Sequence, residues 1–195
     1  MSGNYSILIQ KLDEFIRKYY RNQVIKGCIY ATGISVAFFL FITIAEHFAW
    51  MSPVLRAVFF YLYLAVVIAV LVRLVIIPLL KMMRLGKVIS YQQASAIIGN
   101  HFAEVKDKLL NTLQLNEQLQ HHDSELVRAG IEQKIKDLNP VPFSGAIDLS
   151  KNKKYLPYAL LPLGVLVFIL FAAPNIIKDG TTRLVHYNET YHKPA

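Results

Sequence analysis

Few side chains in this chain of 195 residues stand where they could do chemistry. Arg73 is the single charge in the apolar run at residues 57–80, where a charged group is costly unless it pairs or reaches the membrane surface. It could snorkel to the headgroups, or pair with a partner helix or a lipid phosphate. Glu46 and His47 follow another apolar run and could form a proton or metal site. Polar residues at a water boundary are usually solvated, so we expect these two to be solvated.

Metal and nucleophile chemistry find little support elsewhere in the sequence. His121 and His122 precede Asp123, but adjacent residues in a turn rarely point at one ion, and no third ligand follows at a recognisable spacing. Cys28 is the only cysteine, which excludes an internal disulfide. Phosphate-binding loops, dinucleotide-binding glycine motifs, zinc-protease motifs and nucleophile elbows are absent from the sequence. We therefore predict a protein that is not an enzyme, with no catalytic residue, no metal site and no cofactor.

Three apolar runs define the class of protein. Residues 57–80 are long enough to cross the roughly 30 Å hydrocarbon core of a bilayer as one helix, and residues 27–45 and 155–173 form two further runs. The content of hydrophobic residues is 54%, and it is bunched in these runs rather than spread at a core-forming period. The sequence predicts an all-α membrane protein with three transmembrane helices, a hairpin at 27–80 followed by a third span at 155–173.

The formal net charge is +8, and the distribution of the basic residues along the chain indicates the membrane topology. Lysine and arginine gather before the first run and between the second and third runs, whereas the link between the first two runs holds only Arg56. By the positive-inside rule, the N-terminus and the middle segment are cytoplasmic and the link lies outside. The excess charge also suits the anionic inner leaflet, so we expect contact with membrane lipids and no nucleic-acid partner.

Prolines and the end of the chain indicate how the spans bend and finish. Pro78 and Pro162 each remove a helical hydrogen bond, so we expect helix kinks at both positions. Pro174 is expected to end the third span, which leaves residues 174–195 as the start of an extracytoplasmic region. Residues 181–191 have the β-branched and aromatic content of a strand but no partner strand, so we expect a soluble domain beyond residue 195.

Residues 1–26 are predicted to form an amphipathic N-terminal helix. Leu8, Leu12 and Phe15 belong to an apolar stripe at three- and four-residue intervals, and charged residues fill the other faces. The helix could lie on the cytoplasmic membrane surface with Tyr20 at the headgroup level. Alternatively, its stripe could dock on the protein's own cytoplasmic helices.

Residues 81–154 are predicted to form a cytoplasmic helical hairpin and a connector. One amphipathic helix is expected over 90–119, and a second begins at a cap on Asp123 or Ser124 and ends at Asn139. The connector at 141–154 should skim the membrane with Phe143 and Ile147 dipping in. Because a two-helix core is thin, we expect its apolar residues to contact the membrane-proximal helix or another subunit. The residues assigned to partner or lipid contact are Arg73, Phe102, Leu109, Leu113, Ile131 and Ile135.

The order of these features, with the segments IIGNHFAEVKDKLLNTLQL and FAAPNIIKDGTTRLVHYNETYHKPA, resembles the N-terminal region of large inner-membrane proteins of the Bacteroidota. That family is grouped only as a domain of unknown function (DUF 4175 type). The resemblance extends over essentially the whole chain. It implies a bacterial inner-membrane location, a periplasmic C-terminal end, continuation past residue 195, and association with MoxR-type ATPases and von Willebrand-type membrane proteins. It supplies no catalytic residue.

The resulting hypothesis is an inner-membrane anchor or scaffold subunit that links the cytoplasmic hairpin to a periplasmic domain through protein–protein contacts. Its partners would be other membrane proteins or a second copy of the chain, and no small-molecule substrate is inferred. The alternative is a signal-transmitting regulatory membrane subunit, in which the kinked spans carry movement between compartments. A transporter or secretion-complex subunit is the third reading.

Overall fold

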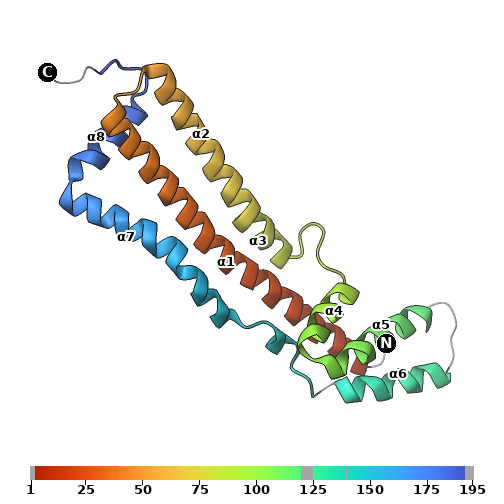
Figure 1. The fold of residues 1–195 in the computed structure, drawn as a ribbon. Helices are drawn as coiled ribbons and strands as arrows, with labels where there is room; N and C mark the ends of the chain where they lie inside the picture. The colour runs from red at the N-terminus through yellow and green to blue at the C-terminus, as the bar shows by residue number, and fades with distance from the viewer. Residues whose placement is uncertain (1–2, 120–124, 139, 192–195) are drawn as a thin grey trace. The chain divides into compact units, whose positions relative to one another are not determined.

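A computed structural model describes residues 3–119, 125–138 and 140–191, and the regular structure in these ranges is entirely helical (Figure 1). The α-helices are α1 Gly3–Ala49, α2 Pro53–Leu71, α3 Ile77–Met82, α4 Tyr91–His101, α5 Lys106–Leu119, α6 Glu125–Leu138, α7 Leu156–Ala172 and α8 Pro174–Val185. A π-helical turn, Val72–Ile76, joins α2 to α3, and 3-10 turns occur at Ala103–Val105, Phe143–Ala146 and Leu149–Tyr155.

Three helical segments are long and apolar enough to cross a membrane, namely Asn4–Ala49, Pro53–Met82 and Phe143–Ala172. The predictions of an all-α protein and of three membrane-crossing helices are therefore confirmed. The chain divides into two compact units. We call Met1–Asn22 with Leu79–Ser150 the helical unit, and Gln23–Pro78 with Lys151–Ala195 the apolar unit.

Helix α1 is longer than the sequence suggested. We expected an amphipathic helix that ends near residue 26 and a separate span from residue 27, but the structure has one uninterrupted helix over Gly3–Ala49. No proline or turn-forming pair stands at the expected boundary, and an isolated glycine such as Gly27 costs a helix only about 1 kcal/mol. The expected boundary is therefore wrong, and α1 contributes residues to both units.

The core of the helical unit includes the apolar stripe of α1. Leu12 and Phe15 are fully buried, and they pack with side chains from α4, α5 and α6. Of the two alternatives for this stripe, docking on the chain's own helices is the arrangement found. Tyr20 is buried in this core, and its hydroxyl accepts a hydrogen bond from the Ile89 N–H at 3.0 Å. The expected headgroup position of Tyr20 is therefore wrong.

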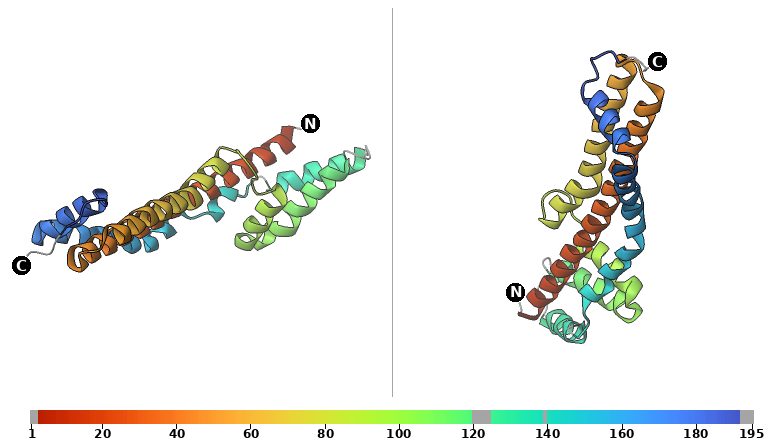
Figure 2. Two further views of the ribbon diagram at one scale, coloured as in Figure 1. Left: turned by 90° about the horizontal axis from the view of Figure 1, so that it is seen from above. Right: turned by 90° about the vertical axis from the view of Figure 1, so that its left-hand side faces the viewer.

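The helix predicted over 90–119 is interrupted. Helix α4 starts with a capping box, in which the Ser90 side chain accepts from the Gln93 N–H, and it ends where Phe102 leaves the helical conformation. A short 3-10 turn then leads into α5, which packs against both α4 and α6 (Figure 2). A Cβ on Gly99 would lie 2.5 Å from Lys106 Cγ, so glycine permits the tight approach of the two helices.

The apolar residues assigned to partner or lipid contact, which are all of that set except Arg73, lie inside the helical unit. Phe102 packs at the edge of its core, and four others are buried in that core, namely Leu109, Leu113, Ile131 and Ile135. Phe143 is also buried there rather than dipping into a membrane, and Ile147 packs against the same core. The physical reason is that α1 and α4 complete a core that α5 and α6 could not close as a pair. The turn expected at His121 and His122, its caps Asp123 and Ser124, and Asn139 lie outside the described residues.

In the apolar unit, α2 and α7 flank α1 (Figure 1). A Cβ on Gly27 would overlap the carbonyl of Leu74, and one on Gly33 would overlap the carbonyl of Tyr158. Small residues let helix backbones approach closely where the hydrophobic effect contributes little, as inside a bilayer. Cys28 on the same helix is exposed.

Both prolines expected to kink the spans lie within helices. The π-helical turn Val72–Ile76 directly precedes Pro78, and such turns are recognised sources of helix bending. Pro162 lies inside α7, which continues as an α-helix on both sides of it. The kink at Pro162 stays a prediction.

The first part of the strand-like segment 181–191 is helical, because α8 continues to Val185, and a turn follows it. Pro174 occupies the start of α8 instead of only ending the third span, and proline is favoured in a first helical turn. Ile177, Gly180 and Leu184 recur at three- and four-residue intervals and are buried. A Cβ on Gly180 would lie 2.5 Å from the Thr43 carbonyl oxygen, which shows how closely α8 packs on α1. Burial at the helical period overrides the β-branched composition here.

Candidate functional site

The charge singled out inside the second span makes no polar interaction in the part of the chain that the structure describes. Arg73 is exposed on the π-helical turn and has neither a hydrogen bond nor an ion pair among those residues. This position is compatible with both options raised for it, a snorkelling side chain and a pair with lipid or partner. The buried charges of the apolar unit lie elsewhere.

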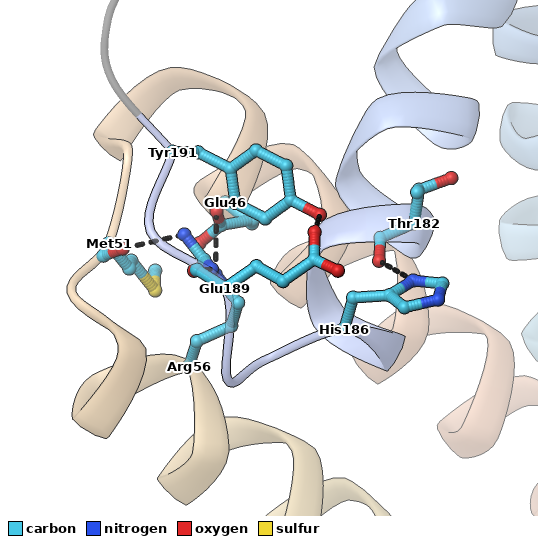
Figure 3. A network of polar contacts seen from close by, with 7 residues as sticks. All are labelled: Glu46, Met51, Arg56, Thr182, His186, Glu189 and Tyr191. Atoms are coloured by element: carbon cyan, nitrogen blue, oxygen red, sulfur yellow. Dashed lines mark hydrogen bonds and ion pairs between the residues drawn. The ribbon is translucent and has the colours of Figure 1, made fainter.

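Glu46 and Arg56 form an ion pair that the sequence analysis missed (Figure 3). Arg56 Nε donates to Glu46 Oε1 at 3.0 Å, and the exposed fractions of the two side chains are 1% and 0%. Glu46 comes from the end of α1 and Arg56 from the first turn of α2. The expectation that Glu46 is solvated is therefore wrong, because the turn between the helices folds the arginine directly onto the carboxylate.

The remaining donors of Arg56 hold the loop and the chain after α8. Nη2 donates to the Met51 carbonyl oxygen at 2.8 Å, and Nη1 donates to the Glu189 carbonyl oxygen at 2.9 Å (Figure 3). The planar guanidinium presents several donors in a fixed geometry, which suits it to joining three segments at once. Arg56 thereby ties α1, α2 and the segment after α8 together.

A second arginine joins the same cluster through an aromatic ring. The guanidinium of Arg183, on α8, lies 3.6 Å from the centre of the Trp50 ring. The Tyr191 ring lies 4.9 Å from the Arg56 guanidinium and 5.7 Å from that of Arg183. Trp50 adopts a positive φ of 49°, which is unfavourable for a bulky residue, so the surrounding contacts must stabilise this turn.

Further polar groups surround the ion pair. The Tyr191 hydroxyl donates to Glu189 Oε2 at 2.7 Å, and Nδ1 of His186 lies 3.0 Å from the Thr182 carbonyl oxygen (Figure 3). The hydrogen bond to Glu189 raises the pKa of Tyr191, and burial and the Glu189 charge act in the same direction. Tyr191 therefore stays protonated in neutral solution and remains a donor.

Some buried polar atoms of this region have no hydrogen-bond partner among the described residues, namely Glu46 Oε2, His47 Nδ1, Thr181 Oγ1 and Arg183 Nη1. A buried carboxylate with one free oxygen depends strongly on its single charged partner, because leaving a buried charge unpaired costs about 3–5 kcal/mol. We call the set Glu46, Trp50, Arg56, Arg183 and Tyr191 the ion-pair cluster.

The chemistry open to the ion-pair cluster is limited by its composition. Arginine stays protonated in proteins and cannot act as a base, and the Glu46 carboxylate is engaged by Arg56. Within the described ranges, no group of three or more His, Cys, Asp and Glu side chains could hold a metal ion. The geometry of the ion-pair cluster is that of a structural tie between helix ends.

The sequence contained a signal for this site. Glu46 and Arg56 have opposite charges and are ten residues apart, on the two sides of a short link between apolar helices. A hairpin that brings those helix ends together also brings the two charges together. The sequence gives no such signal for Arg183 and Tyr191, because their positions depend on the packing of α8 against α1.

Comparisons with known proteins offer no independent assignment: no protein-family model, curated protein or solved structure matches this chain. The family resemblance given above therefore stays an expectation, and the function is argued from the geometry.

Proposed function

We propose that this protein is an inner-membrane anchor or scaffold that links a cytoplasmic helical unit to a periplasmic region through protein–protein contacts. The observation that carries the proposal is the ion-pair cluster. Its buried polar side chains bind to one another and to backbone carbonyls across α1, α2 and the segment after α8. Such a cluster fixes the segment after α8 to the ends of α1 and α2, which suits an anchor that holds a region on this side of the membrane.

The surface of the apolar unit also supports this role. Large apolar side chains are exposed along α2 and α7, with Ile68 60% and Phe168 69% accessible. Exposed apolar surface of this extent is typical of contact with lipid or with other membrane helices. The occupants that we propose are membrane lipids, other membrane proteins and a second copy of the chain.

The experiment for this proposal is isolation of the protein from its native membrane in a mild detergent, followed by native mass spectrometry. A scaffold should bring partner proteins, or further copies of itself, in whole-number ratios. A chain recovered alone after chemical crosslinking in the membrane would contradict the proposal. Resistance of the complexes to salt would locate the contact in the apolar surfaces rather than in exposed charges.

The alternative, a signal-transmitting regulatory subunit, has one observation in its favour. The π-helical turn Val72–Ile76 sits before Pro78, and π-helical turns are frequent at functional sites. Under this alternative, a change at the turn alters the activity of a partner complex without changing its composition. Under the scaffold proposal, a change at the turn should instead alter which proteins the complex contains before it alters the activity of the complex.

A further inference from the structure

A hollow in the helical unit combines three cations with neighbouring apolar surface. It has a volume of about 350 Å³. Its lining residues are Glu14, Arg17, Lys18, Arg21, Met82 and Ser144. Lys18 Nζ donates to the Ser144 carbonyl oxygen at 2.8 Å, which fixes one cation in the wall. From these observations we infer that the hollow binds the phosphate of an anionic phospholipid.

The two arginines supply the recognition. Arg17 and Arg21 are four residues apart, so they lie on the same face of α1, and both are exposed. Neither makes a hydrogen bond or ion pair within the described residues, and Glu14 makes none with them. Guanidinium groups bind phosphate oxygens through paired N–H donors, and two at this spacing can share one phosphate. The three cations exceed the one carboxylate, so the hollow favours an anion.

The position on the chain identifies the source of the phosphate. At 1.5 Å per residue, Arg21 lies about 9 Å along α1 before Gly27, where the apolar run begins. The headgroup layer on each side of a bilayer is about 5–8 Å thick, so the backbone of Arg21 lies at its outer edge and the long arginine side chain can reach a lipid phosphate. Apolar side chains follow Met82 in the same unit, and Met83 is 63% exposed. A phospholipid can place its phosphate against the cations and its acyl chains against the neighbouring apolar side chains, whereas a free phosphate would contact only the cations.

This inference goes beyond the scaffold role and does not depend on it, because it requires only that α1 enters a membrane. Loss of lipid binding would leave the recovery of partner proteins unchanged. Conversely, a chain isolated without partners would still retain the lipid.

The test uses the full chain in vesicles of phosphatidylcholine and phosphatidylglycerol in a four-to-one ratio. Retained phosphatidylglycerol is counted by native mass spectrometry after release into detergent. Arg17→Gln with Arg21→Gln should retain about tenfold less of it, since each basic group near an anionic surface contributes to binding. The matched control is Lys108→Gln with Lys136→Gln, which removes the same charge from exposed positions of the same unit and should retain as much as the unchanged chain.

Three further measurements make the outcome decisive. Arg17→Lys with Arg21→Lys keeps the charge but loses the paired donors, so its retention should be intermediate. The amount of phosphatidylglycerol retained by the unchanged chain should fall in high salt. This measurement needs no variant, so it remains valid even if the glutamine variant does not fold. Inorganic phosphate should not displace the lipid. Equal retention by the hollow and control variants, salt-independent retention, or displacement by inorganic phosphate would each overturn the inference.

Discussion

At the residue scale, Arg56 concentrates the polar interactions of the apolar unit in one side chain. It neutralises Glu46 and holds the Met51 and Glu189 carbonyls, so its three contacts join the end of α1, the following loop and the segment after α8. A buried ion pair of this kind adds little net stability compared with an apolar pair, yet loss of one member is costly. A test of the cluster should therefore separate the cost of leaving one charge unpaired from the net stability that the intact ion pair contributes.

Arg56→Leu should lower the stability of the folded chain by about 3–5 kcal/mol, because it leaves the Glu46 carboxylate buried and unpaired. Thermal unfolding in detergent, followed by circular dichroism, measures the loss. Arg73→Leu is the control, since it removes an exposed arginine from the same unit and should change the melting temperature little. Adding Glu46→Leu to the Arg56→Leu variant should recover much of the loss. No recovery would mean that the carbonyl contacts, rather than the unpaired carboxylate, dominate.

At the element scale, helix breaks and turns decide which side chains meet. Phe102 interrupts the predicted long helix, and the close approach at Gly99 lets α5 pack on α4. The π-helical turn Val72–Ile76 plays a different part, because it widens the helix just before a residue that has no N–H to donate. Each of these features can be changed by one substitution.

Gly99→Ala should destabilise the helical unit by about 1–3 kcal/mol, because the added Cβ meets Lys106 at 2.5 Å and forces the helices apart. Gly130→Ala on α6 is the matched control, since a Cβ there has no neighbour within 4 Å. Alanine favours a helix over glycine, so the control should be stabilised by up to about 1 kcal/mol. Hydrogen exchange of α4 and α5 distinguishes the two. Equal protection in both variants would show that Lys106 moves aside freely.

Pro78→Ala should slow hydrogen exchange in residues 72–76. The new N–H can donate to the carbonyl of Leu74, which restores the bond that proline removes and favours an ordinary α-helical turn. Pro53→Ala is the control, because proline at the first position of α2 replaces no helical hydrogen bond. If exchange in 72–76 is unchanged in the Pro78 variant, packing rather than the proline maintains the π-helical turn.

At the scale of the whole molecule, the proposed topology follows from the distribution of basic residues. In a Cys28→Ser background, cysteines at Ser52 and Asn188 should react with an impermeant maleimide applied from outside the inner membrane. A cysteine at Gln133 should react only after permeabilisation. All three positions are exposed, so reactivity reports the compartment rather than burial. Labelling of Gln133→Cys from outside would reverse the orientation.

The sequence by itself determined the three apolar helices, because the length and apolarity needed to cross a bilayer are properties of each segment alone. Only the tertiary structure decided the rest. The hydrogen bond from Arg56 to the Glu189 carbonyl, the break after α4 and the helical state of α8 all depend on contacts between distant segments. Local patterns do not record such contacts, because burial by a distant partner can override both intrinsic propensity and the usual solvation of a charge.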